Sequence, residues 1–175
     1  MELWDVYDKN RKPLGKIHTR GIAMPPGEFH IVIEIFTINH DGRLLLTQRD
    51  VEKTHPLLWE STGGSITTGE TSLEGALREL EEETGLKADA DELVSLGELN
   101  RGHYFLDSYI WKSTEPIQME NLTLQKGEVC DAKFVTTQDL VLMNQEGLIV
   151  PAVWERYMLY RKEIEQSMNQ KVEEI

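Results

Sequence analysis

One segment near the middle of the chain limits the fold more than any other. It reads GSITTGETSLEGALRELEEETGL and covers residues 64–86. Residues of the kind found in a core follow Leu73 at intervals of 3, 4, 7 and 11. They are Ala76, Leu77, Leu80 and, roughly, Thr84. This spacing is typical of a helix with one face on a core. Thr71 or Ser72 can cap its start through a hydroxyl, and Gly85 can end it.

The glutamates of this expected helix fall on two sides. At about 100° per residue, Glu79, Glu82 and Glu83 share one arc of about 100° away from the apolar stripe. Glu81 and Glu74 fall on a different side. Three carboxylates at positions i, i+3 and i+4 form an oxygen ligand set suited to Mg²⁺ or Mn²⁺. The alternative is an acidic, solvated helix face, and the arc alone leaves both open.

The acidic composition restricts what such a site could bind. The 18 Lys and Arg residues against 31 Asp and Glu give a net charge of −13, which disfavours electrostatic binding of a nucleic acid polymer or an anionic membrane. A bound cation would reconcile this charge with an anionic small molecule. The single cysteine, Cys130, excludes an intrachain disulfide and a cysteine-based zinc cluster. No apolar run approaches the roughly 18 residues of a membrane span, and the N-terminus lacks a signal pattern. We therefore expect a cytoplasmic protein.

Strand and turn signals fill most of the remaining chain. The patterns predict strands at 3–7, 30–38, 43–49, 93–100, 104–111 and 129–135. Turns are expected at 8–15 and 39–42. The run from Leu44 to Leu46 predicts a strand buried on both faces.

This order of elements predicts a single domain of the α/β or α+β class over residues 1–175. Residues 1–29 are expected to form an N-terminal strand and loop. The tail, 151–170, has apolar residues at mostly helical intervals and is expected to be a helix packed on the sheet: Val153, Met158, Leu159 and Ile164.

The central segment also matches a known motif. Gly64, Glu70 and then Arg78-Glu79-Leu80-x-Glu82-Glu83-x-Gly85-Leu86 have the spacing of the Nudix box at every constrained position. The chain thus resembles the Nudix hydrolase superfamily. This resemblance implies an α/β/α sandwich with a mixed β-sheet and a loop–helix–loop at residues 64–86. It also implies Mg²⁺-dependent hydrolysis of the diphosphate linkage in a nucleoside diphosphate derivative.

The resemblance assigns roles to individual residues of the box. It implies that Glu79, Glu82 and Glu83 are metal ligands and that the backbone carbonyl of Gly64 completes the metal site. Glu82 is the expected general base or metal-bridging ligand. Glu128 is a second candidate for the base, because relatives supply a further glutamate from a loop beyond the box, although it could be an ordinary loop charge.

Supporting and substrate-binding roles follow in the same way. Glu70 and Arg78 are expected to hold the loop and the helix together. By helical spacing, Arg78 can pair with Glu74 or with Glu82. Arg49 ends the strand before the box, where relatives often keep an arginine that reaches phosphate, and a surface salt bridge is its alternative.

For histidines and aromatic residues outside the box, the sequence gives weaker support for contact with a substrate. His30 and His55 could contact a substrate, but a strand edge and a loop are their expected places. Five aromatic side chains could stack a base, although core packing is expected for each: Trp4, Tyr7, Trp59, Tyr104 and Trp111.

Two other functions fit parts of the sequence. The stretches ELWDVYDKNRKPLG and PLLWESTGGSITTGE, with Arg20 and GEFH between them, resemble the branch of isopentenyl-diphosphate isomerase. That reaction needs a cysteine beside the substrate, but WESTGG has none and Cys130 lies on a different expected strand. A non-catalytic nucleotide-binding module is the third possibility, and the complete set of box glutamates disfavours it. The expected ligand is a nucleotide or another small diphosphate, and the fold is compatible with a homodimer.

Overall fold

The computed structural model describes residues 2–170 of the chain, and within them seven strands form one mixed sheet. In chain order these strands are β3 (His30–Ile38), β4 (Leu44–Arg49), β5 (Trp59–Glu60), β6 (Thr62–Ser65), β7 (Val94–Asn100), β8 (Tyr104–Lys112) and β9 (Val129–Val135). The central strands β3 and β8 run parallel, and the other pairs are antiparallel. Leu44, Leu45 and Leu46 are each 1% exposed, so the predicted burial of both faces of β4 is confirmed.

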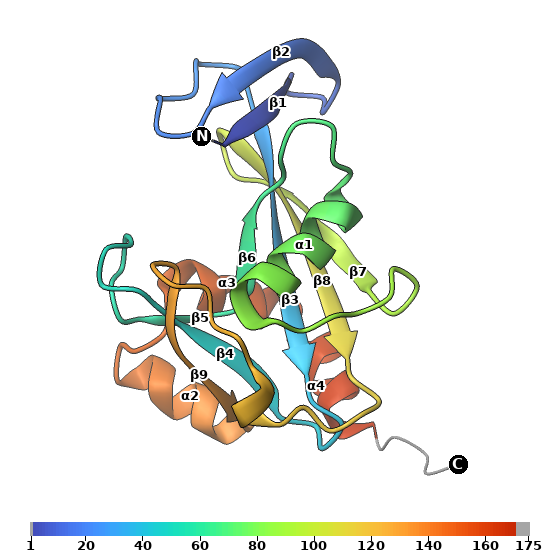
Figure 1. Ribbon diagram of the computed structural model, residues 1–175, viewed down its shortest axis with the longest axis vertical. Helices are drawn as coiled ribbons and strands as arrows, with labels where there is room; N and C mark the ends of the chain where they lie inside the picture. Colours follow the sequence, from blue (N-terminus) through green and yellow to red (C-terminus); the bar gives the residue numbers. More distant parts are fainter. Residues whose placement is uncertain (1, 171–175) are drawn as a thin grey trace.

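Helices cover both faces of the sheet (Figure 1). They are α1 (Ser72–Thr84), α2 (Thr137–Gln145), α3 (Pro151–Leu159) and α4 (Arg161–Asn169). One apolar cluster joins Ile33 and Ile35 of β3 to Leu80 of α1, and a second joins Phe36 of β3 to the helices on the other face, including Ile164 of α4. The expected α/β/α sandwich is confirmed. No helix among residues 2–170 is long and apolar enough to cross a membrane.

Helix α1 begins and ends as its sequence predicts. The Thr71 hydroxyl accepts a bond from the backbone N–H of Glu74, and the Glu74 carboxylate accepts one from the backbone N–H of Thr71 at 2.8 Å. This reciprocal capping box satisfies two free donors at the helix start. Gly85 ends the helix in the left-handed conformation, with φ of 75°.

The N-terminal region contains one more strand than expected. Residues 13–15 were predicted to be part of a turn, but they begin β2 (Pro13–Thr19), which pairs with β1 (Leu3–Tyr7) as a separate hairpin. The first five residues of β2 are exposed, so this strand lacks the apolar alternation that would have revealed it. Its pairing with β1 and the contact of β1 with the loop before α1 hold it in place.

The C-terminal tail also differs from its prediction. A single helix was expected over 151–170, but α3 and α4 are separated at Tyr160, whose backbone leaves the helical conformation. No Gly or Pro marks the break, and the apolar spacing continues across it. The break places Tyr157 and Ile164, each at most 1% exposed, in the same apolar cluster. Helix α2 was not predicted.

The sheet divides in a way that positions a cavity. β3 and β4 share one paired position, Ile38 with Leu44, beside the turn that joins them. Beyond this position β3 pairs instead with β6, while β4 pairs with β5 and β9. The start of β3 and the end of β4 therefore lie apart, and the segment that precedes α1 lies between them.

Candidate active site

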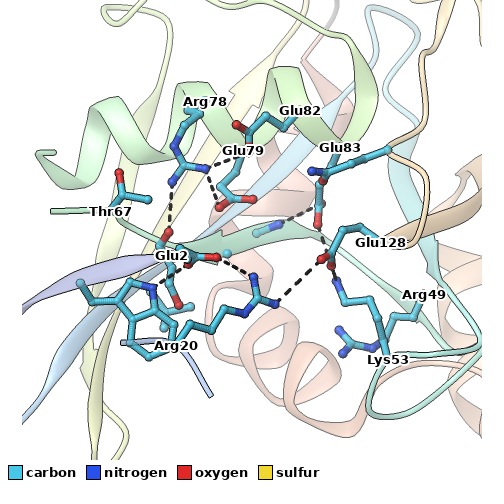
Figure 2. Close-up of a pocket in the computed structure, with 16 residues that line it drawn as sticks. Glu2, Arg20, Arg49, Lys53, Thr67, Arg78, Glu79, Glu82, Glu83 and Glu128 are labelled. Carbon is cyan, nitrogen blue, oxygen red and sulfur yellow. Dashed lines mark hydrogen bonds and ion pairs between the residues drawn. The ribbon is translucent and has the colours of Figure 1, made fainter. Parts of the chain in front are cut away.

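A cavity of about 620 Å³ lies between the two halves of the sheet, beneath α1 (Figure 2). Its lining comes from α1, β6, the N-terminal hairpin, the loop after β4 and the loop before β9. The lining residues are Glu2, Trp4, Arg20, Val32, Arg49, Lys53, Gly63, Gly64, Ser65, Thr67, Arg78, Glu79, Glu82, Glu83, Gln125 and Glu128. The structure thus brings together all the residues that the sequence assigned to metal binding, catalysis or phosphate binding.

The three glutamates of the α1 arc differ in exposure. Glu83 is 2% exposed, whereas the side chain of Glu82 is 45% exposed and reaches the open side of the cavity. Burial, followed by repulsion from Glu60, raises the pKa of Glu83 well above its ordinary value, against the opposing effect of Lys53. Burial also raises the pKa of Glu79 although Arg78 lies beside it. Burial therefore disfavours the charged forms of Glu79 and Glu83 despite their cationic neighbours.

Arg78 connects α1 to the loop that precedes it. Its guanidinium donates to Glu70 at 2.7 Å and to the Ser65 carbonyl at 3.0 Å. On the helix side it donates to Glu79 and Glu82, both at 2.9 Å. Of the two partners that helical spacing allows, the structure selects Glu82, because Glu74 is used in the capping box.

The opposite wall carries cationic side chains from two segments, the end of the N-terminal hairpin and the stretch from Arg49 to Lys53 (Figure 2). Arg20 donates to Glu2 at 2.6 Å and lies 3.9 Å from Glu128. The Lys53 ammonium lies 2.5 Å from the carboxylate of Glu128. Arg49 is held more firmly, since its guanidinium donates to Glu60 at 2.6 Å and to both the carbonyl and the hydroxyl of Thr54. The ion pair left open for Arg49 is therefore present, although the residue also lines the cavity.

The N-terminal hairpin reaches the cavity because it is anchored at several points. Tyr7 forms a bridge with Phe29, and the Thr68 N–H donates to the Leu3 carbonyl at 2.9 Å. Arg11 donates to the buried carboxylate of Asp107 at 2.6 Å. These contacts hold the hairpin so that Glu2, Trp4 and Arg20 complete the cavity.

Several residues considered from sequence do not line the cavity. His30 is buried and stacks on Trp4 at 4.1 Å, and His55 lies in an exposed loop. Trp59 and Trp111 pack in the core, as expected. Cys130, on β9, is exposed and also lies outside the lining, so it is not placed for the chemistry of the isomerase alternative.

Sequence reasoning missed Lys53, Gln125 and Glu2 as site residues. They lie in segments without a regular pattern, and they reach the cavity only through tertiary contacts. The charge of Lys53, four residues after the end of the strand at Arg49, is the one sequence signal that could have indicated it.

The donor atoms on the α1 wall are of the chemical type that a divalent cation needs. Glu79, Glu82, Glu83 and the Gly64 backbone supply oxygen atoms alone, the type that Mg²⁺ and Mn²⁺ prefer. In the described part of the chain, no three His, Cys, Asp or Glu side chains are gathered closely enough to hold a metal ion as they stand. Arg78 draws Glu79 and Glu82 toward itself, and the Gly63 N–H donates to Glu83 at 3.3 Å. Side-chain rotation would be needed to close the ligand set.

Comparison with known proteins agrees with this fold and site. The sequence profile of the NUDIX domain matches residues 28–153. A Nudix hydrolase of Listeria monocytogenes, itself uncharacterized, is 38% identical over 155 residues, which cover 86% of this chain and 89% of that protein. The chain belongs to the Nudix hydrolase family, and the predicted enzyme class, a pyrophosphohydrolase, is confirmed.

Other relatives share the fold at lower identity. An isopentenyl-diphosphate Delta-isomerase of Streptomyces avermitilis is 28% identical over 145 residues, covering 79% of this chain and 73% of that protein. The crystal structure of DR0079 from Deinococcus radiodurans has a TM-score of 0.70 at 20% identity and covers 92% and 98% of the two chains. The NUDIX domain of Shewanella oneidensis NrtR, complexed with ADP ribose, has a TM-score of 0.62 at 18% identity and covers 78% and 88%.

Proposed function

We propose that this protein hydrolyses the diphosphate linkage of a nucleoside diphosphate derivative in a reaction that depends on Mg²⁺ or Mn²⁺. The observation that carries the proposal is the position of the box glutamates. Glu79, Glu82 and Glu83 line one wall of a cavity whose other wall presents Arg20 and Lys53. Carboxylates that can hold a cation and side chains that can bind phosphate thus face one space.

The ligand set consists of Glu79, Glu82, Glu83 and the Gly64 carbonyl. A divalent cation bound there would neutralise phosphate charge and lower the pKa of an attacking water. Glu82 is the proposed general base or metal-bridging ligand, because its carboxylate is the most exposed of the three and lies closest to bulk water among them. Glu128 is the second candidate for the base, and Lys53 and Arg20 hold it at the cavity wall.

We assign the remaining residues of the site to substrate binding or to support of the box. Arg20, Lys53 and Arg49 would each contact phosphate oxygens by giving up part of a contact with a carboxylate. These partners are Glu2, Glu128 and Glu60, respectively. Glu70 and Arg78 support the box by joining the loop to α1. Trp4 is the aromatic side chain of the cavity lining and the candidate for contact with a base.

The proposed substrate class is supported by the volume of the cavity and by similarity to a domain that binds ADP ribose. A volume of about 620 Å³ falls in the usual range for small-molecule sites and accommodates a nucleotide-sized ligand. The ADP ribose in the related Shewanella domain is a nucleoside diphosphate derivative. A single domain, a cytoplasmic location and a possible homodimer stay predictions.

A substrate panel tests the proposal. The purified protein is incubated with nucleoside triphosphates, nucleotide sugars, ADP-ribose, dinucleotides and isopentenyl diphosphate, with Mg²⁺ and with excess chelator. Products are identified by chromatography and ³¹P NMR. We expect cleavage of at least one nucleoside diphosphate derivative into two phosphorylated or phosphate-containing products only when Mg²⁺ is present. Isomerisation without cleavage, or cleavage that persists in chelator, would overturn it.

A further inference from the structure

Three carboxylates converge on a single ammonium group at the edge of the cavity. Lys53 Nζ lies 2.5 Å from Glu128 Oε2 and 4.0 Å from both Glu60 Oε1 and Glu83 Oε1. The Lys53 side chain is 16% exposed, so it points into the protein rather than into solvent. In Figure 2, Lys53 reaches Glu128 from below, and Glu83 lies above them on α1.

We propose that the Lys53 ammonium is the resident counter-ion of these carboxylates and that a divalent cation must displace it when it binds to the α1 wall. Lys53 then competes with the metal and sets its apparent affinity. This proposal rests on the proposed function only for the place of the metal. It assigns Lys53 a positioning role that is separate from any contact with substrate.

Electrostatics explains why the two cations exclude each other. Glu83 is 2% exposed and faces Glu60 and Glu79, so it needs positive charge nearby when it is ionised. The ammonium supplies this charge from 4.0 Å. A divalent ion and an ammonium ion about 4 Å apart repel strongly enough, even in water, to change metal affinity by roughly tenfold or more.

Lys53 can leave, whereas its cationic neighbour is fixed. Arg49 is bound through its guanidinium to Glu60 and Thr54. The Lys53 ammonium has one short contact, with Glu128, on a flexible four-carbon stem. The backbone of its loop is held independently, since the Asp50 N–H donates to the Glu128 carbonyl and the Lys53 N–H to the Asp50 carbonyl. The side chain can therefore swing out without moving the loop.

Displacement of Lys53 has a consequence for Glu128. Its carboxylate has two cationic neighbours, Lys53 at 2.5 Å and Arg20 at 3.9 Å. Removal of the closer one leaves the carboxylate free to turn toward a metal or a water. Metal binding would thus make the second candidate base available.

Mn²⁺ binding without substrate tests this proposal. The free Mn²⁺ signal in electron paramagnetic resonance gives the dissociation constant for the wild type, Lys53→Met and Lys87→Met. Lys87→Met removes the same charge from an exposed site, where Lys87 pairs with Glu81. We expect Lys53→Met to bind Mn²⁺ about tenfold more tightly, and Lys87→Met to stay within about twofold of the wild type. Lys53→Gln serves as a second variant, and thermal melts confirm that each is folded.

Two results would overturn the proposed role of Lys53. If Lys53→Met and Lys53→Gln bind Mn²⁺ with wild-type or weaker affinity, the counter-ion role is wrong. A raised KM for the cleaved substrate with unchanged Mn²⁺ affinity would also overturn it and would make Lys53 a substrate-binding residue. Neither result affects the proposed function, because cleavage by the wild type is measured separately.

Discussion

The carboxylate of Glu79 occupies the space that a side chain at Gly64 would need. A Cβ added at Gly64 would lie 2.3 Å from Glu79 Oε1 and 2.4 Å from Glu79 Cδ. A side chain at this position would therefore push the end of the Glu79 side chain out of its present place. This contact also brings the Gly64 backbone next to a proposed metal ligand.

The variant Gly64→Ala tests this relationship. We expect turnover to fall by about tenfold or more, because a displaced ligand at the site weakens metal-assisted catalysis. The free energy of unfolding should change by less than about 1 kcal/mol, because the displaced group is the end of a flexible side chain. Steady-state kinetics measures the turnover, and urea denaturation measures the free energy of unfolding. Wild-type turnover in Gly64→Ala would show that the position of Glu79 does not matter.

The pair Arg78 and Glu70 should contribute measurably to stability. Their side chains are 25% and 21% exposed, and Arg78 has further partners in Glu79 and the Ser65 carbonyl. A double-mutant cycle with Arg78→Met and Glu70→Gln should give a coupling energy of about 1–2 kcal/mol in urea unfolding, because partial burial and several shared bonds strengthen the pair.

An exposed ion pair provides the matched control for that cycle. Lys87 and Glu81 lie 2.9 Å apart with side chains 76% and 54% exposed. Their coupling energy should be at most about 0.5 kcal/mol, because solvent screens exposed pairs. Equal coupling energies in the two cycles would mean that Arg78 does not connect the loop to α1 in the way the structure indicates.

His30 should make the protein sensitive to mild acid. Burial, followed by the positive charges of His103 and His18, lowers the pKa of His30 to about 4. The unfolded chain takes up this proton near pH 6.5, so the stabilisation is complete above that pH and is lost as the pH falls toward 4. Between pH 7.5 and 5 the loss should be about 1–2 kcal/mol.

The variant His30→Phe isolates this effect. It keeps an aromatic ring against Trp4 and removes the titrating group. We expect the pH dependence of its unfolding free energy to be shallower than that of the wild type by the same amount. His55→Gln, which replaces a histidine in an exposed loop, serves as the control. Parallel curves for the wild type and His30→Phe would show that folding does not lower the pKa of His30.

Local sequence signals predicted the regular parts of the fold because each carries its own physical cause. The strand 30–38 is rich in β-branched and aromatic residues, whereas α1 has helical periodicity and both caps. β2 was not predicted, because most of its residues are exposed and its backbone pairing with β1 is what defines it. The break at Tyr160 has no Gly or Pro signal, and only packing against the core explains it.

The candidate site likewise has one part that the sequence predicted and another that it did not. Helical spacing placed the α1 glutamates together, and the resemblance to the Nudix box added Gly64. Lys53 and Glu2 could not be placed in this way, since their place depends on how two loops and a hairpin meet across the sheet. Arg49 shows the limit of resemblance, because its guanidinium is engaged by Glu60 and Thr54.

The central claim is that the arc of Glu79, Glu82 and Glu83, and not the acidic helix as a whole, binds the metal for hydrolysis. Adjacent variants of one helix test it most directly, because Glu82→Gln and Glu81→Gln remove the same charge one residue apart. Mn²⁺ affinity and Mg²⁺-dependent turnover are measured for both. We expect Glu82→Gln to lose about 100-fold or more in turnover and to bind Mn²⁺ more weakly, with Glu81→Gln within about twofold of the wild type. Equal losses in the two variants, or full turnover in Glu82→Gln, would contradict the claim.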